Sequence, residues 1–188
     1  MKTYNIPYGI EISDLSPRQG SDELRKKLEI PKSAKIAVTV SDMIEKQDIV
    51  NILRAFQQVV IKKPSSYLII VGDGPYFKEI EREMLNLALG SHVILIGPTP
   101  PHEVADYIDL AHVFINIGGR TSGFLICPAD VGALSQLLLG LFLGNIPAEV
   151  IGKNARNKAL DIFDTKKMVQ ETLGAYESIL NRSSWVKL

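Results

Sequence analysis

The sequence predicts an α/β fold in which a parallel β-sheet is covered by helices on both faces. Four short segments are apolar at nearly every position, which is typical of strands that are buried on both faces. Amphipathic segments of helical period alternate with them, as the crossovers of a parallel sheet require. The predicted strands are residues 35–40, 67–71, 92–96 and 112–117.

The predicted helices follow from apolar periodicity and from end signals. Residues 48–62 carry apolar side chains at spacings of three and four, which predicts a core-facing helix. Pro75 suits the first position of the helix predicted at 75–89, because the first turn needs no N–H donor there. Ser21 caps a short helix over 21–28, which Pro31 ends. The remaining predicted elements are a helix at 102–110, a short strand at 124–126 and helices at 131–143, 148–162 and 166–180.

The junction between the predicted strands 112–117 and 124–126 is too short for a parallel crossover. Only six residues, 118–123, separate the two strands, whereas a crossover usually takes about a dozen or more. Either the two strands pair antiparallel, or the chain lacks a segment at this point.

Composition indicates an ordinary globular domain. The chain has 188 residues, and 21 basic side chains balance 21 acidic ones, so its formal net charge is zero. The length predicts one domain, and the charge balance argues against a nucleic-acid partner. Cys127 is the single cysteine, which indicates a reducing compartment. No signal peptide opens the sequence and no apolar run reaches the ~20 residues of a membrane span. We therefore expect a cytoplasmic location, and membrane contact is not indicated.

Two turns at the carboxyl ends of predicted strands are candidate ligand loops. Gly72-Asp73-Gly74 follows a strand, as a dinucleotide fingerprint does, but Phe77 stands where that fingerprint needs a third glycine. A tight turn explains these residues equally well. Lys46 lies in the predicted loop before a helix whose N–H groups and dipole favour an anion. Open α/β sheets bind ligands at this edge, so the two turns together predict an anion site.

Other chemistry finds little support in the spacing of side chains. The three histidines are too far apart to form a metal-ligand motif, and no nucleophile–base pair can be identified. We therefore predict no metal and no cofactor, and we assign no catalytic residue. The glutamates at 79, 81 and 83 and the basic residues at 153–158 are interpreted as solvated helix faces.

Several short signatures, in order along almost the whole chain, resemble those of the C-terminal, donor-binding half of a GT-B glycosyltransferase of the group 1 (family 4) retaining type. The string LIIVGDGP, residues 68–75, is nearly that family's most recognisable one. Glu45-Lys46 resembles its EKG motif. The other similar segments are IPYGIE at 6–11, Arg25 with LEIP at 28–31, ILIGPT at 94–99, AHVFI at 111–115, GFLICPAD at 123–130, and Phe163 and Tyr176 in the closing helices.

The resemblance implies a Rossmann-like doubly wound parallel sheet and a nucleotide-sugar donor. It places Lys46, and Ser41 at the position of a phosphate-binding arginine, at the donor diphosphate. Gly97, Pro98 and Thr99 would line the base pocket. The donor-site loops would contain Gly72, Asp73, Gly74, Gly118 and Gly119.

This chain departs from the family pattern in three ways. Ser41 replaces an arginine and Val40 replaces a glycine. The third departure is the short junction at 117–123, where family members carry a crossover with two glutamates that bind the donor. By resemblance, residues 1–188 form one nucleotide-sugar-binding domain that lacks this segment and also lacks its N-terminal acceptor domain, so we expect no sugar transfer from the chain alone.

Three functions are compatible with these residues. The leading one is the donor-binding domain of a glycosyltransferase that moves a sugar to an unknown acceptor. Ser41 and the absent glutamates favour instead a non-catalytic GT-B-like binding or partner module. A nucleotide-sugar epimerase of the same fold fits LIIVGDGP less well.

Overall fold

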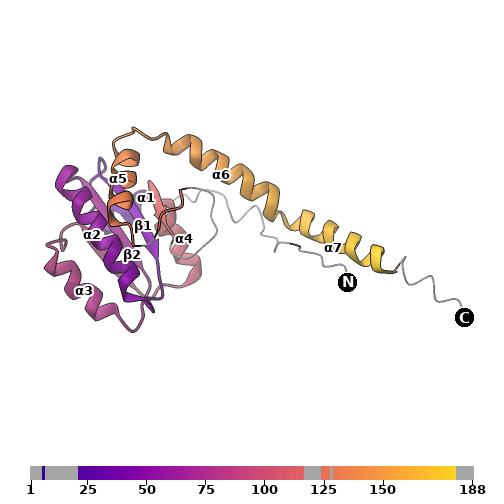
Figure 1. Ribbon diagram of the computed structural model, residues 1–188, viewed down its shortest axis with the longest axis horizontal. Helices are drawn as coiled ribbons and strands as arrows, with labels where there is room; N and C mark the ends of the chain where they lie inside the picture. The colour runs from indigo at the N-terminus through magenta and orange to yellow at the C-terminus, as the bar shows by residue number, and fades with distance from the viewer. Residues whose placement is uncertain (1–5, 7–20, 117–123, 128, 181–188) are drawn as a thin grey trace, which may run out of the picture. The chain divides into compact units, whose positions relative to one another are not determined.

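The computed structural model describes residues 6, 21–116, 124–127 and 129–180 (Figure 1). The chain divides into two compact units, residues 18–149 and residues 1–17 with 150–188. The first unit holds a four-stranded sheet, and the second holds most of the last two helices.

The sheet is parallel throughout its described strands. It consists of β1 (Lys35–Val40), β2 (Ser66–Val71), β3 (Val93–Gly97) and β4 (Val113–Ile115) in the order β3-β2-β1-β4. From β1 the chain moves outward to β3 and then returns to place β4 on the opposite side of β1. The strand order therefore reverses between β1 and β4, and the predicted doubly wound α/β fold is confirmed.

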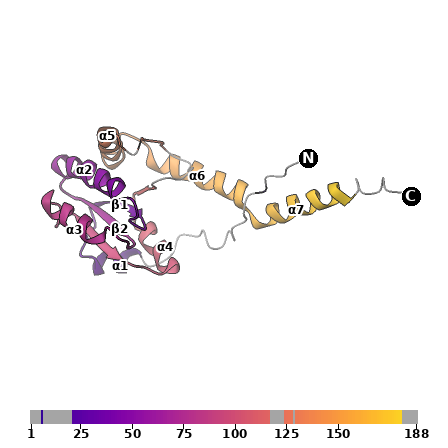
Figure 2. The ribbon, with the colours of Figure 1, turned by 60° about the horizontal axis from the view of Figure 1, so that its bottom comes forward.

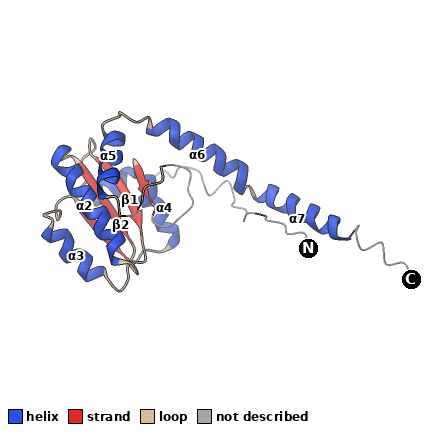
Figure 3. Ribbon diagram, in the orientation of Figure 1, coloured by secondary structure: helices blue, strands red, loops and turns tan. Residues whose placement is uncertain are grey.

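Helices cover both faces of this sheet (Figures 2 and 3). On one face lie α2 (Lys46–Lys62), α3 (Phe77–Asn86) and α5 (Val131–Phe142), and on the other lie α1 (Ser21–Lys27) and α4 (Pro101–Asp109). Side chains alternate between the faces as the period of a strand requires. Ala37, Leu68 and Ile70 join the core under α2, whereas Ile36, Val38, Ile69 and Val71 join the core under α4.

His112 begins the pairing of β4 with β1. Its backbone N–H donates to the Ile36 carbonyl at 2.8 Å, and its Nδ1 accepts from the Ile36 N–H at 3.2 Å. Burial, with the charges of Lys35 and Arg25, lowers the pKa of His112 from 6.5 to about 4. The imidazole is therefore neutral at pH 7, as an Nδ1 acceptor must be.

Three sequence predictions about elements are wrong. Residues 124–127 form no strand, and Leu125 is 82% exposed. Without a strand here, an antiparallel pair cannot explain the short junction. An apolar segment becomes a strand only when a neighbouring strand satisfies its backbone hydrogen bonds. Lys46 is the first residue of α2 rather than a loop residue. Pro75 precedes the N-cap Tyr76, so it stands outside α3.

Residues 117–123 lie outside the described residues, so the missing segment remains a prediction, as does the single domain.

Two helices close the chain, α6 (Ala148–Phe163) and α7 (Thr165–Leu180). Asp164 lies between them and caps α7, because its Oδ1 accepts from the Lys166 N–H at 2.9 Å. Lys167 of α7 binds back to Asp161 of α6, at 2.9 Å from the carbonyl oxygen and 3.5 Å from Oδ1. The two helices thus meet at a defined break, where the side chain of Asp164 caps the start of α7 directly after the end of α6.

Candidate functional site

The carboxyl ends of the strands carry the loops that a ligand meets in an open α/β sheet. Three of these loops are described: residues 41–45 after β1, residues 72–76 after β2, and residues 98–100 after β3. The strand order reverses at β1, so the loop after β1 lies at the point where such sheets leave a crevice.

The loop after β1 has a tight turn with an unusual backbone. Ser41 Oγ accepts a hydrogen bond from the Met43 N–H at 3.0 Å. Met43 itself has φ of +49°, in the left-handed region that a non-glycine side chain rarely adopts. Its side chain is fully buried in the core under α2. Packing of this side chain holds the strained turn in place, which is how strained backbone persists near functional sites.

Gly72 and Gly74 fit against this turn. A Cβ atom on Gly72 would overlap the carbonyl oxygen of Ser41, and one on Gly74 would overlap the carbonyl oxygen of Asp42. Gly72 also has φ of +123°. The interpretation of GDG as a tight turn is therefore incomplete, because both glycines allow the close approach of two backbones.

The loop after β3 is joined to the same assembly. The Gly72 N–H donates to the Gly97 carbonyl at 2.9 Å, and the Ser41 N–H donates to the Val71 carbonyl at 3.0 Å. Thr99 Oγ1 donates to the Gly97 carbonyl at 3.1 Å. Backbone hydrogen bonds therefore link the three loops in the order of their strands.

A pocket of about 460 Å³ opens beside the end of β1. Its lining residues come from the β1–α2 connection and the first turn of α2: Val40, Ser41, Asp42, Ile44, Glu45 and Asp48. Three of the six are carboxylates, and within the described part of the chain no lysine or arginine forms an ion pair with them. The described wall of the pocket is therefore acidic.

In contrast to the acidic wall of the pocket, the start of α2 favours a bound anion. Glu45 is the N-cap residue, but its side chain makes no capping hydrogen bond, so the first N–H groups of α2 lack a side-chain acceptor. Lys46 is exposed at the first position of this helix. A helix N-terminus and an adjacent lysine both favour a bound anion.

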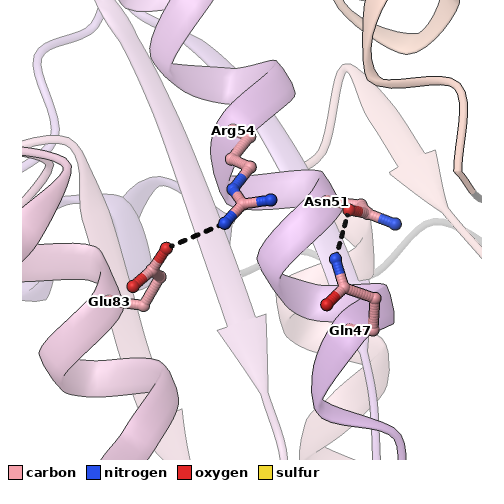
Figure 4. Close-up of polar contacts among 4 residues, drawn as sticks. All are labelled: Gln47, Asn51, Arg54 and Glu83. Carbon is pink, nitrogen blue, oxygen red and sulfur yellow. Dashed lines mark hydrogen bonds and ion pairs between the residues drawn. The ribbon is translucent and has the colours of Figure 1, made fainter.

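Polar contacts hold α2 in position behind this end (Figure 4). Gln47 Nε2 donates to Asn51 Oδ1 at 2.8 Å one turn further along the helix. Arg54 lies 3.5 Å from Glu83 of α3. On the side of α5, the Ser135 hydroxyl donates to Gln58 Oε1 at 2.8 Å. Side chains of α2 thus contact both neighbouring helices, α3 and α5.

The structure brings together some of the residues predicted for the donor site. Ser41 lines the pocket, Lys46 begins the adjoining helix, and Gly72 and Gly74 pack against the Ser41–Met43 turn. Gly97, Pro98 and Thr99 lie at the end of β3, two strands away, and the Gly72 N–H joins this loop to the turn by its hydrogen bond to the Gly97 carbonyl. Gly118 and Gly119 lie outside the described residues.

Sequence reasoning missed the acidic wall and the role of Met43. Asp42, Glu45 and Asp48 recur every third residue, so this signal was visible, but only the structure shows that they share a pocket. Among the residues described, no group of three or more His, Cys, Asp or Glu side chains could hold a metal ion. In the same part of the chain, every helix is too short or too polar to cross a membrane.

Residues 20–117 match the protein family described as "Glycosyl transferases group 1". The chain belongs to the group 1 glycosyltransferases. The match covers more than half of the sequence, from before α1 to beyond β4, and it confirms the resemblance noted in the sequence.

Curated relatives are also glycosyltransferases. The alpha-monoglucosyldiacylglycerol synthase of Streptococcus pneumoniae is 31% identical over 115 residues, which are 59% of this chain and 26% of that protein. The phosphatidylinositol N-acetylglucosaminyltransferase GPI3 subunit of Saccharomyces cerevisiae is 21% identical in an alignment 196 positions long, which covers 96% of this chain and 42% of that protein. The chain thus spans less than half the length of these relatives.

Solved structures confirm the fold. Anabaena HepE, in complex with UDP and glucose, has a TM-score of 0.73 and 16% identity over 90% of this chain and 55% of its own. The C-terminal domain of a group 1 glycosyltransferase, LpcC from Francisella tularensis, has a TM-score of 0.65 and 15% identity, over 83% of this chain and 99% of that domain. The Rossmann-like fold of a GT-B half is therefore confirmed for this group 1 chain.

Proposed function

We propose that this chain is the donor-binding half of a retaining glycosyltransferase, which holds a nucleotide-activated sugar for transfer to an acceptor bound by another part of the protein. The observation that carries the proposal is the uncapped N-terminus of α2, with Lys46, beside a pocket at the point where the strand order reverses. HepE, which shares the fold, was solved with UDP and glucose.

The arrangement favours a departing nucleoside diphosphate. Oriented N–H groups and a lysine stabilise negative charge as it develops on the leaving group, without reorganisation during the reaction. In this role Lys46 and the first turn of α2 contact the diphosphate, and Ser41 donates its hydroxyl proton to a phosphate oxygen. The base lies toward Gly97–Thr99, and the donor sugar lies toward Gly72–Gly74.

The acidic wall opposes this role and supports a second candidate function. Each exposed carboxylate about 4 Å from a phosphate costs roughly 1 kcal/mol in water. Asp42 and Glu45 are exposed, and Asp48 is half-buried. Together with serine in place of arginine at position 41, they favour a GT-B-like module that binds a partner without transferring sugar.

Calorimetric titration with UDP, GDP, UDP-glucose and UDP-N-acetylglucosamine separates the two functions. We expect one of the nucleotides to bind, and we expect Lys46→Gln to lower the affinity for that nucleotide about five- to tenfold. Asp42→Asn should strengthen the same binding several-fold. Lys78→Gln is the matched control, because Lys78 is an exposed lysine in the first turn of α3 and does not line the pocket.

Two results would reject the donor-site proposal. One is the absence of binding by every nucleotide, which would leave the binding module. The other is an equal effect of Lys46→Gln and Lys78→Gln, which would place the anion elsewhere. We also expect no sugar transfer by this chain alone, since acceptor binding is assigned to another half. Turnover of UDP-glucose by the isolated chain would overturn that expectation.

A further inference from the structure

The zero net charge of the chain conceals a separation of charge across the sheet. Every helix that leaves the carboxyl end of a strand returns the chain to the amino edge, so the last turns of these helices meet the first residues of the strands there. At this edge the ends of α1 and α2 and the start of β1 carry six lysines. We call them the lysine edge: Lys26, Lys27, Lys32, Lys35, Lys62 and Lys63.

Few described carboxylates accompany the lysine edge. They are Glu29, after α1, Glu83, in the last turn of α3 and paired with Arg54, and Asp106 and Asp109, in the last turn of α4. No ion pair joins any of the six lysines to a described acidic side chain. The opposite edge carries six carboxylates and two lysines: Asp42, Glu45, Asp48, Asp73, Glu79 and Glu103, with Lys46 and Lys78. The two edges of the sheet therefore differ in sign.

The backbone beneath the lysine edge is well fixed. The Arg25 guanidinium donates to the Pro31 carbonyl at 2.7 and 3.2 Å and to the Ala34 carbonyl at 2.7 Å. The Lys35 N–H donates to the Ser65 carbonyl at 3.0 Å, next to the end of α2. These bonds tie the end of α1 and the region after α2 to the start of β1, so the lysines lie on one rigid edge.

His112 reports the potential at this edge. Burial is the main cause of its lowered pKa, and the charges of Lys35 and Arg25 lower it further. Of the six lysines, Lys35 is thus close enough to act on this imidazole.

Exposed aliphatic side chains accompany the lysines. Ile61, directly before Lys62, is 75% exposed, and Leu85 in the last turn of α3 is 61% exposed. Ile108 in the last turn of α4 is 37% exposed. Three helices therefore end at the amino edge with an aliphatic side chain in solvent, which burial in the protein does not explain.

We propose that the lysine edge, with Ile61 beside Lys62, docks on the surface of an anionic lipid bilayer. Clustered lysines are attracted to acidic headgroups, and aliphatic side chains beside them enter the interface and lose their contact with water. A duplex nucleic acid fits less well, because Ile61, Leu85 and Ile108 would remain in water against its phosphates. The proposal is independent of the donor site, which lies at the other edge of the sheet.

Vesicle sedimentation with the full chain tests the proposal, in 0.1 M salt, with vesicles of phosphatidylcholine alone or with about one third phosphatidylglycerol. We expect binding only to the anionic vesicles, weakened by added salt. The variant Lys26→Gln/Lys27→Gln/Lys62→Gln/Lys63→Gln should lose on the order of a hundredfold in partition, and Ile61→Ser about tenfold. Replacement of the same four lysines by arginine should retain binding.

The matched control removes four exposed lysines from other elements: Lys78, Lys153, Lys158 and Lys166, each replaced by Gln. This variant has the same net charge as the lysine-edge variant and should still bind. Circular dichroism confirms that every variant is folded. The proposal is overturned if the two quadruple variants lose binding equally, if the folded wild-type chain ignores anionic vesicles, or if it prefers duplex DNA to them.

Discussion

The backbone of Gly72 lies directly against the carbonyl oxygen of Ser41, so that a single Cβ atom on Gly72 would overlap this oxygen. The contact joins the turn after β2 to the loop after β1, and the Gly72 N–H extends it to Gly97 in the loop after β3. The three loops of the candidate site are therefore packed together. The stability of this packing depends on three glycines: Gly72, Gly74 and Gly97.

Four alanine substitutions should separate steric overlap from backbone strain. Gly72→Ala combines overlap with a positive φ and should cost about 3 kcal/mol or more in free energy of unfolding. Gly74→Ala adds overlap alone and should cost about 2–3 kcal/mol. Gly97→Ala meets no atom within 4 Å but has φ of +81°, so it should cost about 1–2 kcal/mol.

Gly90→Ala is the control, because its Cβ would make one ordinary contact, 3.4 Å from Leu85 Cδ2. It should change the free energy of unfolding by less than about 0.5 kcal/mol. Urea denaturation of the four variants gives the order directly. If Gly74→Ala proved as mild as Gly90→Ala, the two loops would not be packed as described.

The pH dependence of stability should contain a contribution from His112. Its pKa is lowered to about 4 in the folded chain, from 6.5. Well above pH 6.5 the imidazole is neutral in both the folded and the unfolded chain. As the pH falls toward 4, His112 gains a proton mainly in the unfolded chain, so the free energy of unfolding decreases. Because this side chain is partly exposed, we expect a loss of only about 1–2 kcal/mol by pH 4.

His112→Asn provides the matched variant, since Asn Oδ1 can accept the Ile36 N–H in place of Nδ1. Urea denaturation at several pH values between 7 and 4 should show a flatter profile for the variant. Parallel profiles for the two proteins would mean that His112 takes up a proton without cost.

An arginine at position 41 should strengthen nucleotide binding. Ser41→Arg adds a charged donor to the pocket, and we expect about a five- to tenfold gain in UDP affinity by calorimetry. It also removes the Ser41 Oγ acceptor of the Met43 N–H, at a cost of about 1 kcal/mol in stability. Ser41→Ala isolates that second effect, and equal UDP affinities of the two variants would contradict a phosphate near this position.

Thr39 offers a stabilising substitution. Its hydroxyl is fully buried in β1 and has no hydrogen-bond partner within the described structure. Thr39→Val keeps the shape of the side chain and should raise the free energy of unfolding by about 1 kcal/mol. Ser135→Ala should lower it by a similar amount, since the Ser135 hydroxyl donates to Gln58 at 2.8 Å. A destabilised Thr39→Val would contradict the absence of a partner for this hydroxyl.

The sheet was largely predictable from sequence, because burial on both faces leaves a plain pattern. Residues 35–40 are apolar or β-branched after Lys35, and they form β1 with the predicted bounds. Residues 124–126 show the same pattern but form no strand. The apolar pattern shows which side chains can be buried, whereas a strand also needs a neighbouring strand to satisfy its backbone hydrogen bonds.

The site was less predictable, because its contacts join distant parts of the chain. GDG could be recognised as a turn, yet its fit against the Ser41–Met43 turn exists only once β1 and β2 are adjacent. The charge of the two sheet edges was hidden for a related reason. A net charge adds all side chains together, whereas the topology sorts them by edge.

The position of β1 in the sheet has a consequence for how the chain folds. Each neighbour of β1 is separated from it by a whole crossover or more, since Lys35 lies opposite Ser66 and Ala37 lies opposite Val113. Among the described strands none pairs with a hairpin partner, so chain entropy must be lost over long loops before these ladders form. The β1–β4 ladder closes the longest of these loops and is only three residue pairs long. It should therefore form last and open first, which makes the β4 side of the sheet the natural starting point of unfolding.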